Sequence, residues 1–257
     1  MKIASIQLNI TWENSQENLK MAALYTLEAK ESGCDVIVFP EMFNSGFSMN
    51  IAITAEKSGD KTYQFLSHLA KEHEIYVIAG ITEMSTLENS NKAENVALIF
   101  NRKGNLESRY VKNHSFNLAQ EGTFFIEGKD QSVFAIDGVC SSIFICYDLR
   151  FPEVFRKIAK QVDVIFIIAN WPEQRHQHWE ALIKARAIEN QCFIVAVNRT
   201  GTDGNGLSYL GGSQVIDPLG NILSCGNKGQ EMIVTSIDTS QVNSIRTKLP
   251  FITDMKY

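Results

Sequence analysis

The sequence predicts an α/β fold in which mixed β-sheets are covered by helices. Helical and strand patterns alternate at both ends of the chain, and hairpin signals cluster in its middle. An uninterrupted apolar run at 36–39 is typical of a strand covered on both faces. The 257 residues, 44% hydrophobic and 21% charged, suffice to bury a sizeable core. Because no linker or break in composition divides the chain, we expect a single domain over residues 1–257.

The chain opens with a strand followed by a helix. Ile6, Leu8 and Ile10 alternate with polar residues, which predicts a half-buried strand, and apolar residues then recur at helical spacing from Leu19 up to Gly33. The elements expected next are the buried strand at 36–39, stopped by Pro40, a helix at about 60–74 and a strand at 75–81.

Two antiparallel hairpins are expected in the middle of the chain. Strands at 96–100 and 106–112 flank a turn at 101–105, and strands at 132–136 and 139–145 flank Asp137-Gly138. The α/β alternation then resumes with a helix at 152–160, a strand at 162–169, a helix at 172–190, a strand at 192–197, two strands around the turn at 217–221, and a last strand at 231–237.

Two of the buried strands have similar sequences. The segments 34–41 and 162–167 share an Asp-Val-Ile-hydrophobic pattern, which indicates either an internal two-fold repeat or the general likeness of buried strands.

Charge and cysteine content exclude several functional classes. A net charge of −5 gives no basic field for a nucleic acid, and no apolar run approaches the roughly 20 residues that span a bilayer. The first residues lack the apolar core of a signal peptide, so we expect a cytoplasmic protein with neither nucleic-acid nor membrane partners. Five scattered cysteines without a CxxC argue against a disulfide scaffold and a zinc module.

Cys146 is the best candidate for a nucleophile. The apolar stretch 141–145 ends at this residue, and Pro152-Glu153 soon afterwards is a good first helical turn, so the thiol falls at a strand-to-helix turn. Backbone N–H groups in such a turn can stabilise a developing negative charge. The alternative is a small buried core residue. The sequence contexts of Cys34, Cys140, Cys192 and Cys225 (strand stretches and a glycine-rich turn) are poorer for a nucleophile.

Glu41 and Lys112 also fall at strand ends. Glu41 follows a buried strand and precedes an aromatic loop, and apolar surroundings would raise the pKa of its carboxyl group and suit it as a general base. Lys112 closes a strand, where its ammonium group can stabilise an oxyanion. Taken singly, each is more often an exposed turn or edge residue. Base, cation and thiol together indicate nucleophilic catalysis.

Three segments of the sequence resemble, in order and spacing, the signature segments of the nitrilase (carbon–nitrogen hydrolase) superfamily. They are Pro-Glu-Met-Phe-Asn-Ser-Gly around Glu41, Tyr-Val-Lys-Asn-His-Ser-Phe around Lys112, and Ile-Cys-Tyr-Asp-Leu-Arg-Phe-Pro-Glu around Cys146. The resemblance implies a four-layer α-β-β-α sandwich, a homodimer or higher homo-oligomer, and no cofactor or metal. It also implies that Glu41 is the base, Lys112 the oxyanion cation, Cys146 the nucleophile and the Tyr147 N–H the second oxyanion donor. Glu121 falls where many members have a second active-site glutamate.

Two further segments resemble the bacterial omega-amidase branch, whose members act on 2-oxoglutaramate and 2-oxosuccinamate. These are Ala-Asn-Trp-Pro at 169–172 and Lys-Ala-Arg-Ala-Ile-Glu-Asn-Gln at 184–191. Such substrates carry a carboxylate, for which Arg175 is a candidate cation, although a helix-surface role is equally compatible with its position. The expected substrate-binding residues are Phe43, Phe116, Asn170, Trp171 and Arg175. Arg150 and Asp148 are expected to pair behind the nucleophile.

Other functions remain open at this point. A papain-like thiol hydrolase would use His114 as its base, and His176 with His178 forms an HxH that suggests a metal, although residues two apart on a helix point to different sides. A catalytically silent binding scaffold is the non-enzyme alternative. Among enzymes, amidases for other small acyl amides, carbamoyl-amine hydrolases and nitrilases are the rivals.

Overall fold

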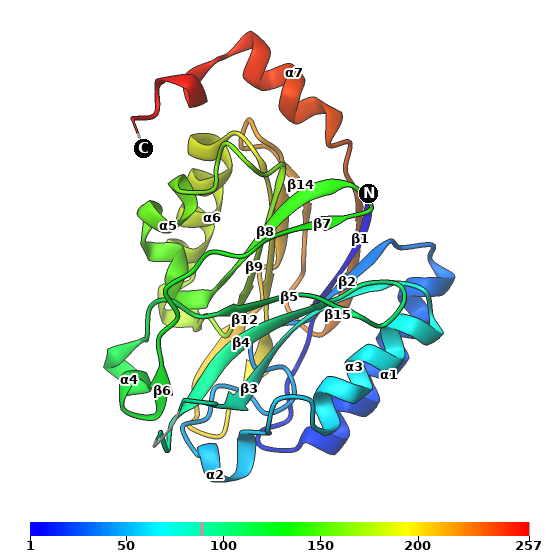
Figure 1. The fold of residues 1–257 in the computed structure, drawn as a ribbon, viewed down its shortest axis with the longest axis vertical. Coiled ribbons are helices and arrows are strands. Elements are labelled where there is room, and N and C mark those ends of the chain that lie inside the picture. Colours follow the sequence, from blue (N-terminus) through cyan, green and yellow to red (C-terminus); the bar gives the residue numbers. More distant parts are fainter. Residues whose placement is uncertain (88–89, 257) are drawn as a thin grey trace.

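Two mixed β-sheets form the centre of the structure (Figure 1). The computed structural model describes residues 1–87 and 90–256. The first sheet has the order β15 (Glu231–Ser236), β1 (Lys2–Gln7), β2 (Val36–Val38), β3 (Tyr76–Met84), β4 (Ala93–Phe100) and β5 (Leu106–Val111), and the short β6 (Phe125–Ile126) also pairs with β4. The second has the order β14 (Ile222–Cys225), β13 (Gln214–Ile216), β10 (Phe193–Asn198), β9 (Val164–Ala169), β8 (Val139–Ile145) and β7 (Val133–Ile136).

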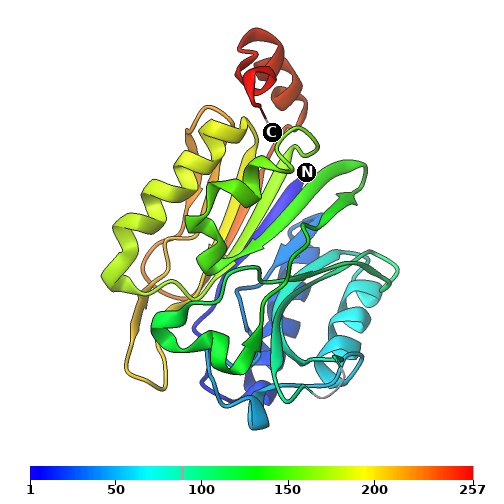
Figure 2. The same ribbon diagram turned by 60° about the vertical axis from the view of Figure 1, so that its left-hand side comes forward.

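Helices cover the outer face of each sheet. Helices α1 (Ser15–Glu31) and α3 (Lys61–Glu72) pack on the first sheet, and α5 (Pro152–Arg156) and α6 (His176–Asn190) on the second. Figure 2 shows α6 in yellow-green along the second sheet and the cyan α3 on the opposite side of the molecule.

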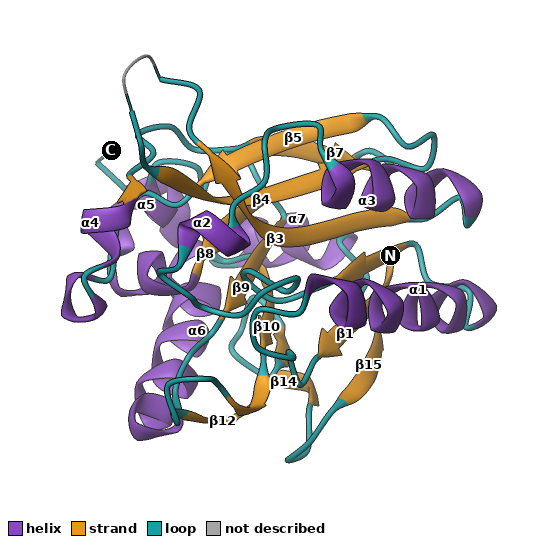
Figure 3. Ribbon diagram, turned by 90° about the horizontal axis from the view of Figure 1, so that it is seen from below, coloured by secondary structure: helices purple, strands orange, loops and turns teal. Residues whose placement is uncertain are grey.

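Alternate side chains along the strands point into two different cores. In β2, Val36 and Val38 belong to the core between the two sheets, whereas Ile37 belongs to the core beneath α1 and α3. β4 repeats the pattern, with Ile99 facing the other sheet and Leu98 facing the helices. This period of two on strands buried on both faces produces helix, sheet, sheet and helix layers, also visible in Figure 3, so the predicted four-layer α-β-β-α sandwich is confirmed.

The half-buried first strand was a wrong prediction. β1 lies between β15 and β2 in the interior of its sheet, and five of its six residues are buried. Gln7 is fully buried because its Nε2 donates to the carbonyl oxygens of Asn227 and Gly229, and its Oε1 accepts from the Ser213 N–H. A polar side chain whose hydrogen bonds are all satisfied tolerates the interior.

The two similar sequence segments occupy equivalent places in the two sheets. β2 is the middle of the parallel strands β1, β2 and β3, and β9 is the middle of the parallel strands β8, β9 and β10. In each sheet one antiparallel strand flanks the three parallel strands on one side, β15 in the first sheet and β7 in the second. Two antiparallel strands flank them on the other side, β4 and β5 in the first sheet and β13 and β14 in the second. This repeated topology is that of an internal two-fold.

Several short elements escaped the sequence analysis. They are α2 (Ile51–Thr54), α4 (Glu121–Phe124), the hairpin of β11 (Thr200–Thr202) and β12 (Ser208–Leu210), and α7 (Ser240–Lys248), which lies beyond the ends of the sheets at the top of Figure 1. The helix expected at 152–160 ends at Arg156 and continues as turns. Within the residues described, no helix has the length and apolar character needed to cross a membrane.

Candidate active site

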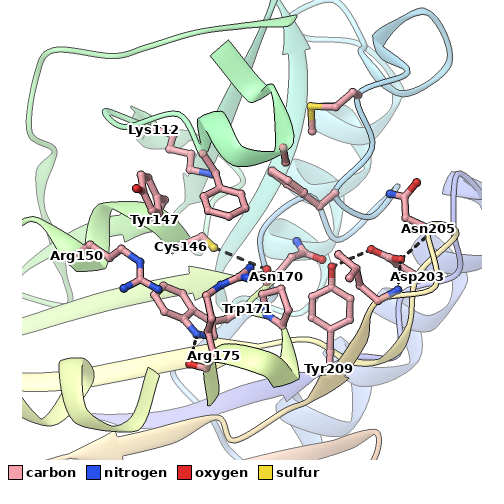
Figure 4. Close-up of a pocket in the computed structure, with 16 residues that line it drawn as sticks. Lys112, Cys146, Tyr147, Arg150, Asn170, Trp171, Arg175, Asp203, Asn205 and Tyr209 are labelled. Carbon is pink, nitrogen blue, oxygen red and sulfur yellow. Dashed lines mark hydrogen bonds between the residues drawn. The ribbon is translucent and has the colours of Figure 1, made fainter. Parts of the chain in front are cut away.

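A cavity of about 400 Å³ opens where β8 and β9 end (Figure 4). Among the residues expected in the site, Lys112, Phe116, Cys146, Tyr147, Asn170, Trp171 and Arg175 line it. Glu41 and Glu121 are buried and contact the Lys112 ammonium group. The structure therefore brings together residues that are far apart in the chain.

Glu41 follows β2, and its carboxylate receives hydrogen bonds from three residues. Oε1 accepts from Lys112 Nζ at 2.9 Å and from Asn95 Nδ2 at 2.7 Å, and Oε2 accepts from the Asn170 N–H at 2.8 Å. The expectation of apolar surroundings was wrong, because these donors come from β4, the end of β5 and the end of β9. The carboxylate is fixed in place, with a cation beside it.

Lys112 lies between two glutamates. Its Nζ donates to Glu41 Oε1 and to both carboxylate oxygens of Glu121, each at 2.9 Å, and the side chain is 3% exposed. Burial alone would lower the pKa of this ammonium group, but the charges of Glu121 and Glu41 outweigh burial and raise it. Lys112 therefore stays protonated.

Glu121, at the start of α4, is held as firmly as Glu41. Its Oε2 accepts from the Phe116 N–H at 2.6 Å, and its Oε1 accepts from Asn95 Nδ2 at 3.0 Å. Asn95 of β4 thus bridges the two glutamates, while its backbone carbonyl accepts from the Lys112 N–H. Sequence reasoning missed Asn95, because only the pairing of β4 with β5 brings it beside Lys112.

Cys146 begins a 3₁₀ helix, Cys146–Arg150, directly after β8. Its φ of 45° lies in the left-handed region, which non-glycine residues rarely adopt. Sγ lies 3.8 Å from the backbone oxygen of Asn170 (Figure 4). Burial, followed by the charge of Glu41, raises the pKa of the thiol well above its ordinary value, against the opposing charge of Lys112. Cys146 is therefore a neutral thiol at rest, and such a thiol needs a base before it can act as a nucleophile.

Two arginines line the cavity without a carboxylate partner. The guanidinium group of Arg150 lies 4.8 Å from the ring centroid of Trp171, and that of Arg175 lies 5.1 Å from that of Phe116. In the part of the chain that the structure describes, neither has an acidic side chain within 4.0 Å, whereas Arg102, Arg109 and Arg186 do. Arg175 is thus a cavity residue and not merely a helix-surface arginine.

Two expectations about individual side chains were wrong. Arg150 does not pair with Asp148, because the Asp148 carboxylate is occupied by Tyr110, His114 and the Ile145 N–H, while Arg150 contacts His178 at 3.2 Å and faces the cavity. Phe43 does not line the cavity.

The ring of Phe43 lies in the core beneath α1 and α3, 5.2 Å from that of Phe39, where it is removed from water, and its N–H bonds to the Gly80 carbonyl. Phe47 and Met49, from the same loop, line the cavity in its place.

One wall of the cavity was not predicted from the sequence. It comes from the β11–β12 hairpin and contains Asp203, Asn205, Leu207 and Tyr209. Tyr209 donates its hydroxyl to Asp203 Oδ2 at 2.8 Å, on the side of the cavity away from Arg150 in Figure 4. The three-residue strands and the glycines at 201, 204 and 206 leave no hydrophobic period to detect.

The histidine alternatives find no support in the geometry. His114 Nδ1 lies 2.8 Å from Asp148 Oδ1, its ring stacks on Phe151, and it is not among the cavity residues. His176 contacts Glu180 and His178 contacts Arg150. Over residues 1–87 and 90–256, no group of three or more His, Cys, Asp or Glu residues is arranged to hold a metal ion.

Comparisons with known proteins agree with this fold. Residues 2–247 match the family model "Carbon-nitrogen hydrolase". The chain is 34% identical over 256 residues to the 2-oxoglutaramate amidase of Bacillus subtilis, covering 99% of this chain and 97% of the relative. It is also 34% identical to the omega-amidase YafV of Escherichia coli K12, covering 97% of this chain and 94% of the relative.

Among solved structures, XC1258 of Xanthomonas campestris, described as a CN-hydrolase superfamily protein with an arsenic adduct in its active site, superposes with a TM-score of 0.92 at 28% identity, covering 100% of this chain and 97% of the other. Nit3 of Saccharomyces cerevisiae gives a TM-score of 0.89 at 25% identity, covering 100% of this chain and 97% of the other. The chain therefore belongs to the carbon–nitrogen hydrolase family.

Proposed function

We propose that the protein is an omega-amidase, a cysteine-dependent hydrolase that converts a short 2-oxo acid with a distal amide into the 2-oxo dicarboxylate and ammonia. The names of its curated relatives support this reaction. 2-Oxoglutaramate and 2-oxosuccinamate are the expected substrates.

The first half of the reaction forms a thioester. Glu41 accepts the thiol proton as Cys146 Sγ attacks the amide carbon, and the carbonyl oxygen becomes an oxyanion stabilised by the Lys112 ammonium group and the Tyr147 N–H. As the tetrahedral intermediate collapses, Glu41 returns the proton to the leaving nitrogen, the C–N bond breaks, and ammonia departs. The raised pKa of the thiol supports a step in which proton transfer accompanies attack.

The second half hydrolyses the thioester. Glu41, now able to accept a proton again, takes one from water, whose oxygen attacks the thioester carbon. The C–S bond breaks, and the sulfur recovers its proton. Glu121 supports both halves by bonding Lys112 with both oxygens, which keeps the ammonium group charged and fixed.

The observation that carries the substrate class is that two guanidinium groups line the cavity with no carboxylate partner among the described residues. Arg150 and Arg175 rest on aromatic rings, which fixes them at low cost in side-chain entropy, and their charge is free to bind an anion. A carboxylate held there, with the amide carbon at Cys146, orients the substrate along the cavity. Asn170, Phe116 and Trp171 complete the walls around the acyl chain.

A substrate panel tests the proposal. We expect kcat/KM to be highest for 2-oxoglutaramate or 2-oxosuccinamate. It should be lower by at least about tenfold for a neutral aliphatic amide of equal length, because that compound has no carboxylate for the arginines to bind. A nitrile and an N-carbamoyl amine complete the panel. A neutral amide, nitrile or carbamoyl compound hydrolysed best would overturn the omega-amidase assignment and leave the family chemistry in place.

We further propose that the protein is a single domain over residues 1–257, acts as a homodimer or higher homo-oligomer, and works in the cytoplasm. The core shared by the two sheets supports the first point, and the family resemblance supports the second. The five cysteines are free in the structure, which suits a reducing compartment. Sedimentation analysis measures the oligomeric state, and a single monomeric species would contradict the second point.

A further inference from the structure

The turn that carries Cys146 adopts a conformation that must be held by its surroundings. A non-glycine residue in the left-handed region costs on the order of 1 kcal/mol or more, and Cys146 adopts it at the junction of β8 and the 3₁₀ helix. The second oxyanion donor of the proposed mechanism, the Tyr147 N–H, belongs to the same turn. Small movements of this turn would displace the nucleophile and the donor together.

Asp148 lies in this turn and is fully buried, and within the described residues no lysine or arginine forms an ion pair with it. Its Oδ2 accepts from the Ile145 N–H at 3.1 Å and from the Tyr110 hydroxyl at 2.8 Å. Its Oδ1 accepts from the His114 N–H at 2.9 Å and lies 2.8 Å from His114 Nδ1. Burial and the charge of Asp148 raise the pKa of Tyr110 well above its ordinary value, so the phenol remains a donor.

These partners flank the two catalytic side chains. Ile145 directly precedes Cys146, and Tyr110 and His114 lie two residues on either side of Lys112. Lys112 follows a strand of the first sheet, whereas Cys146 follows a strand of the second. One carboxylate therefore joins the nucleophile turn of one sheet to the lysine-bearing segment of the other.

We propose that Asp148 is a positioning residue, which fixes the thiol of Cys146 and the oxyanion donors in one geometry by bonding the segments on both sides of Lys112 to the nucleophile turn. The inference rests on the proposed roles of Cys146 and Lys112, and not on the identity of the substrate. A misplacement of about 1 Å between reacting groups costs on the order of 100-fold in rate. Loss of the carboxylate should thus lower kcat and leave the binding of substrate largely intact.

Asp148→Asn is the test. The amide keeps the size of the side chain, but its NH₂ group is a donor that faces N–H or O–H donors and cannot accept their hydrogen bonds. Activity is measured with the amide that the parent protein hydrolyses fastest, and is divided by the number of Cys146 thiols alkylated by iodoacetamide, counted on the Cys146 peptide because the exposed Cys140 and Cys225 also react. We expect kcat per titrated site to fall by about 100-fold, with KM within about threefold of the parent. A kcat per site within about threefold of the parent would show that Asp148 serves folding only, and would overturn the proposal.

The rate of Cys146 alkylation by iodoacetamide separates this inference from the proposed function, since it involves no amide. We expect Asp148→Asn to slow it at least about tenfold, even if the parent protein hydrolyses no 2-oxo acid amide. An unchanged alkylation rate contradicts the proposal. If Asp148→Asn does not fold, the double variant Tyr110→Phe/His114→Ala removes two side-chain partners and keeps the carboxylate. A kcat loss of about tenfold or more is then expected, and parental kcat would overturn the inference.

Discussion

At the scale of single residues, the site is organised by charge. Lys112 stays protonated because two buried carboxylates outweigh its burial, and Cys146 stays a neutral thiol because burial and Glu41 outweigh Lys112. In the proposed mechanism Glu41 therefore accepts the thiol proton, because the protonated lysine cannot act as a base. These roles follow from contacts that sequence spacing alone does not specify.

Glu41→Gln tests the role of the base. The amide preserves the shape of the side chain but cannot accept the thiol proton, so we expect kcat to fall at least about 100-fold. Glu83→Gln is a matched control, because Glu83 is a buried glutamate of β3 that pairs with Arg109 outside the cavity. Its kcat should stay within about twofold of the parent. The kcat of both variants is measured by steady-state kinetics. A Glu41→Gln enzyme with near-parental kcat would show that Glu41 is not the base.

Arg150→Met and Arg175→Met test the carboxylate site. Each removes a charged hydrogen-bond donor worth about 1.5–3 kcal/mol, so kcat/KM for the preferred 2-oxo acid amide should fall about 10- to 100-fold. For a neutral amide of equal length, kcat/KM should change less than about threefold. Arg156→Met, on the exposed face of α5, is the control. Equal losses with both substrates would mean that the arginines have only a structural role.

The raised pKa values of the Cys146 and Cys192 thiols give the folding stability a definite pH dependence. Burial raises the pKa of Cys146 well above its ordinary value and that of Cys192 to about 12, so the folded protein retains protons that the unfolded chain loses above about pH 8.5. This contribution is fully present below that pH and is lost as the pH rises. We expect the Tm to fall between about pH 8 and pH 10, and to fall less steeply in Cys146→Ser. Parallel thermal denaturation curves in the two proteins would contradict this.

At the scale of elements, β3 supports the loop that carries Glu41. Gly80 of β3 donates its N–H to the Pro40 carbonyl and accepts from the Phe43 N–H, so it bonds the chain on both sides of Glu41. A Cβ at Gly80 would lie 2.6 Å from Glu41 Cα and 2.9 Å from the Met42 nitrogen, which leaves room for glycine alone. Glu41 is therefore positioned by the backbone of the neighbouring strand.

Gly80→Ala should displace Glu41 and lower kcat by about 100-fold, together with a loss of stability. Ala79→Gly weakens the same strand by roughly 0.5–1 kcal/mol without introducing a clash, and should keep kcat within about threefold. The two variants are compared by kcat and thermal denaturation. Equal kcat in both would show that the close approach of Gly80 to Glu41 does not matter for catalysis.

Elements with a strong hydrophobic period were predictable from the sequence, and elements without one were not. The runs that became β2, β8 and β9 carry the signal of strands buried on both faces, and their ends located Glu41, Cys146 and Asn170. The pairing of Arg150 with Asp148 was wrongly predicted, because the need of a charge beside a buried turn for a partner does not specify which residue that partner is. Apart from the Ile145 N–H, the partners of Asp148 come from β5 and the loop after it, which only the packing of the two sheets brings close.

At the scale of the whole molecule, the site depends on the two sheets packing face to face. Glu41 and Lys112 come from one sheet, Cys146 and Asn170 from the other, and the β11–β12 hairpin closes the cavity. The signature segments predict which residues lie together around Cys146, but they do not predict the cavity wall that contains Asp203 and Tyr209. That wall depends on tertiary contacts of a glycine-rich hairpin.

The central claim, that Cys146 carries the acyl group of a 2-oxo acid, is tested most directly by mass spectrometry of the protein quenched in acid within milliseconds to seconds of mixing with 2-oxoglutaramate. The mechanism predicts a mass increase equal to the 2-oxo acyl group, confined after proteolysis to the peptide that contains Cys146. An acyl group on another side chain, or parental turnover with Cys146 unmodified at every quench time, would contradict the account.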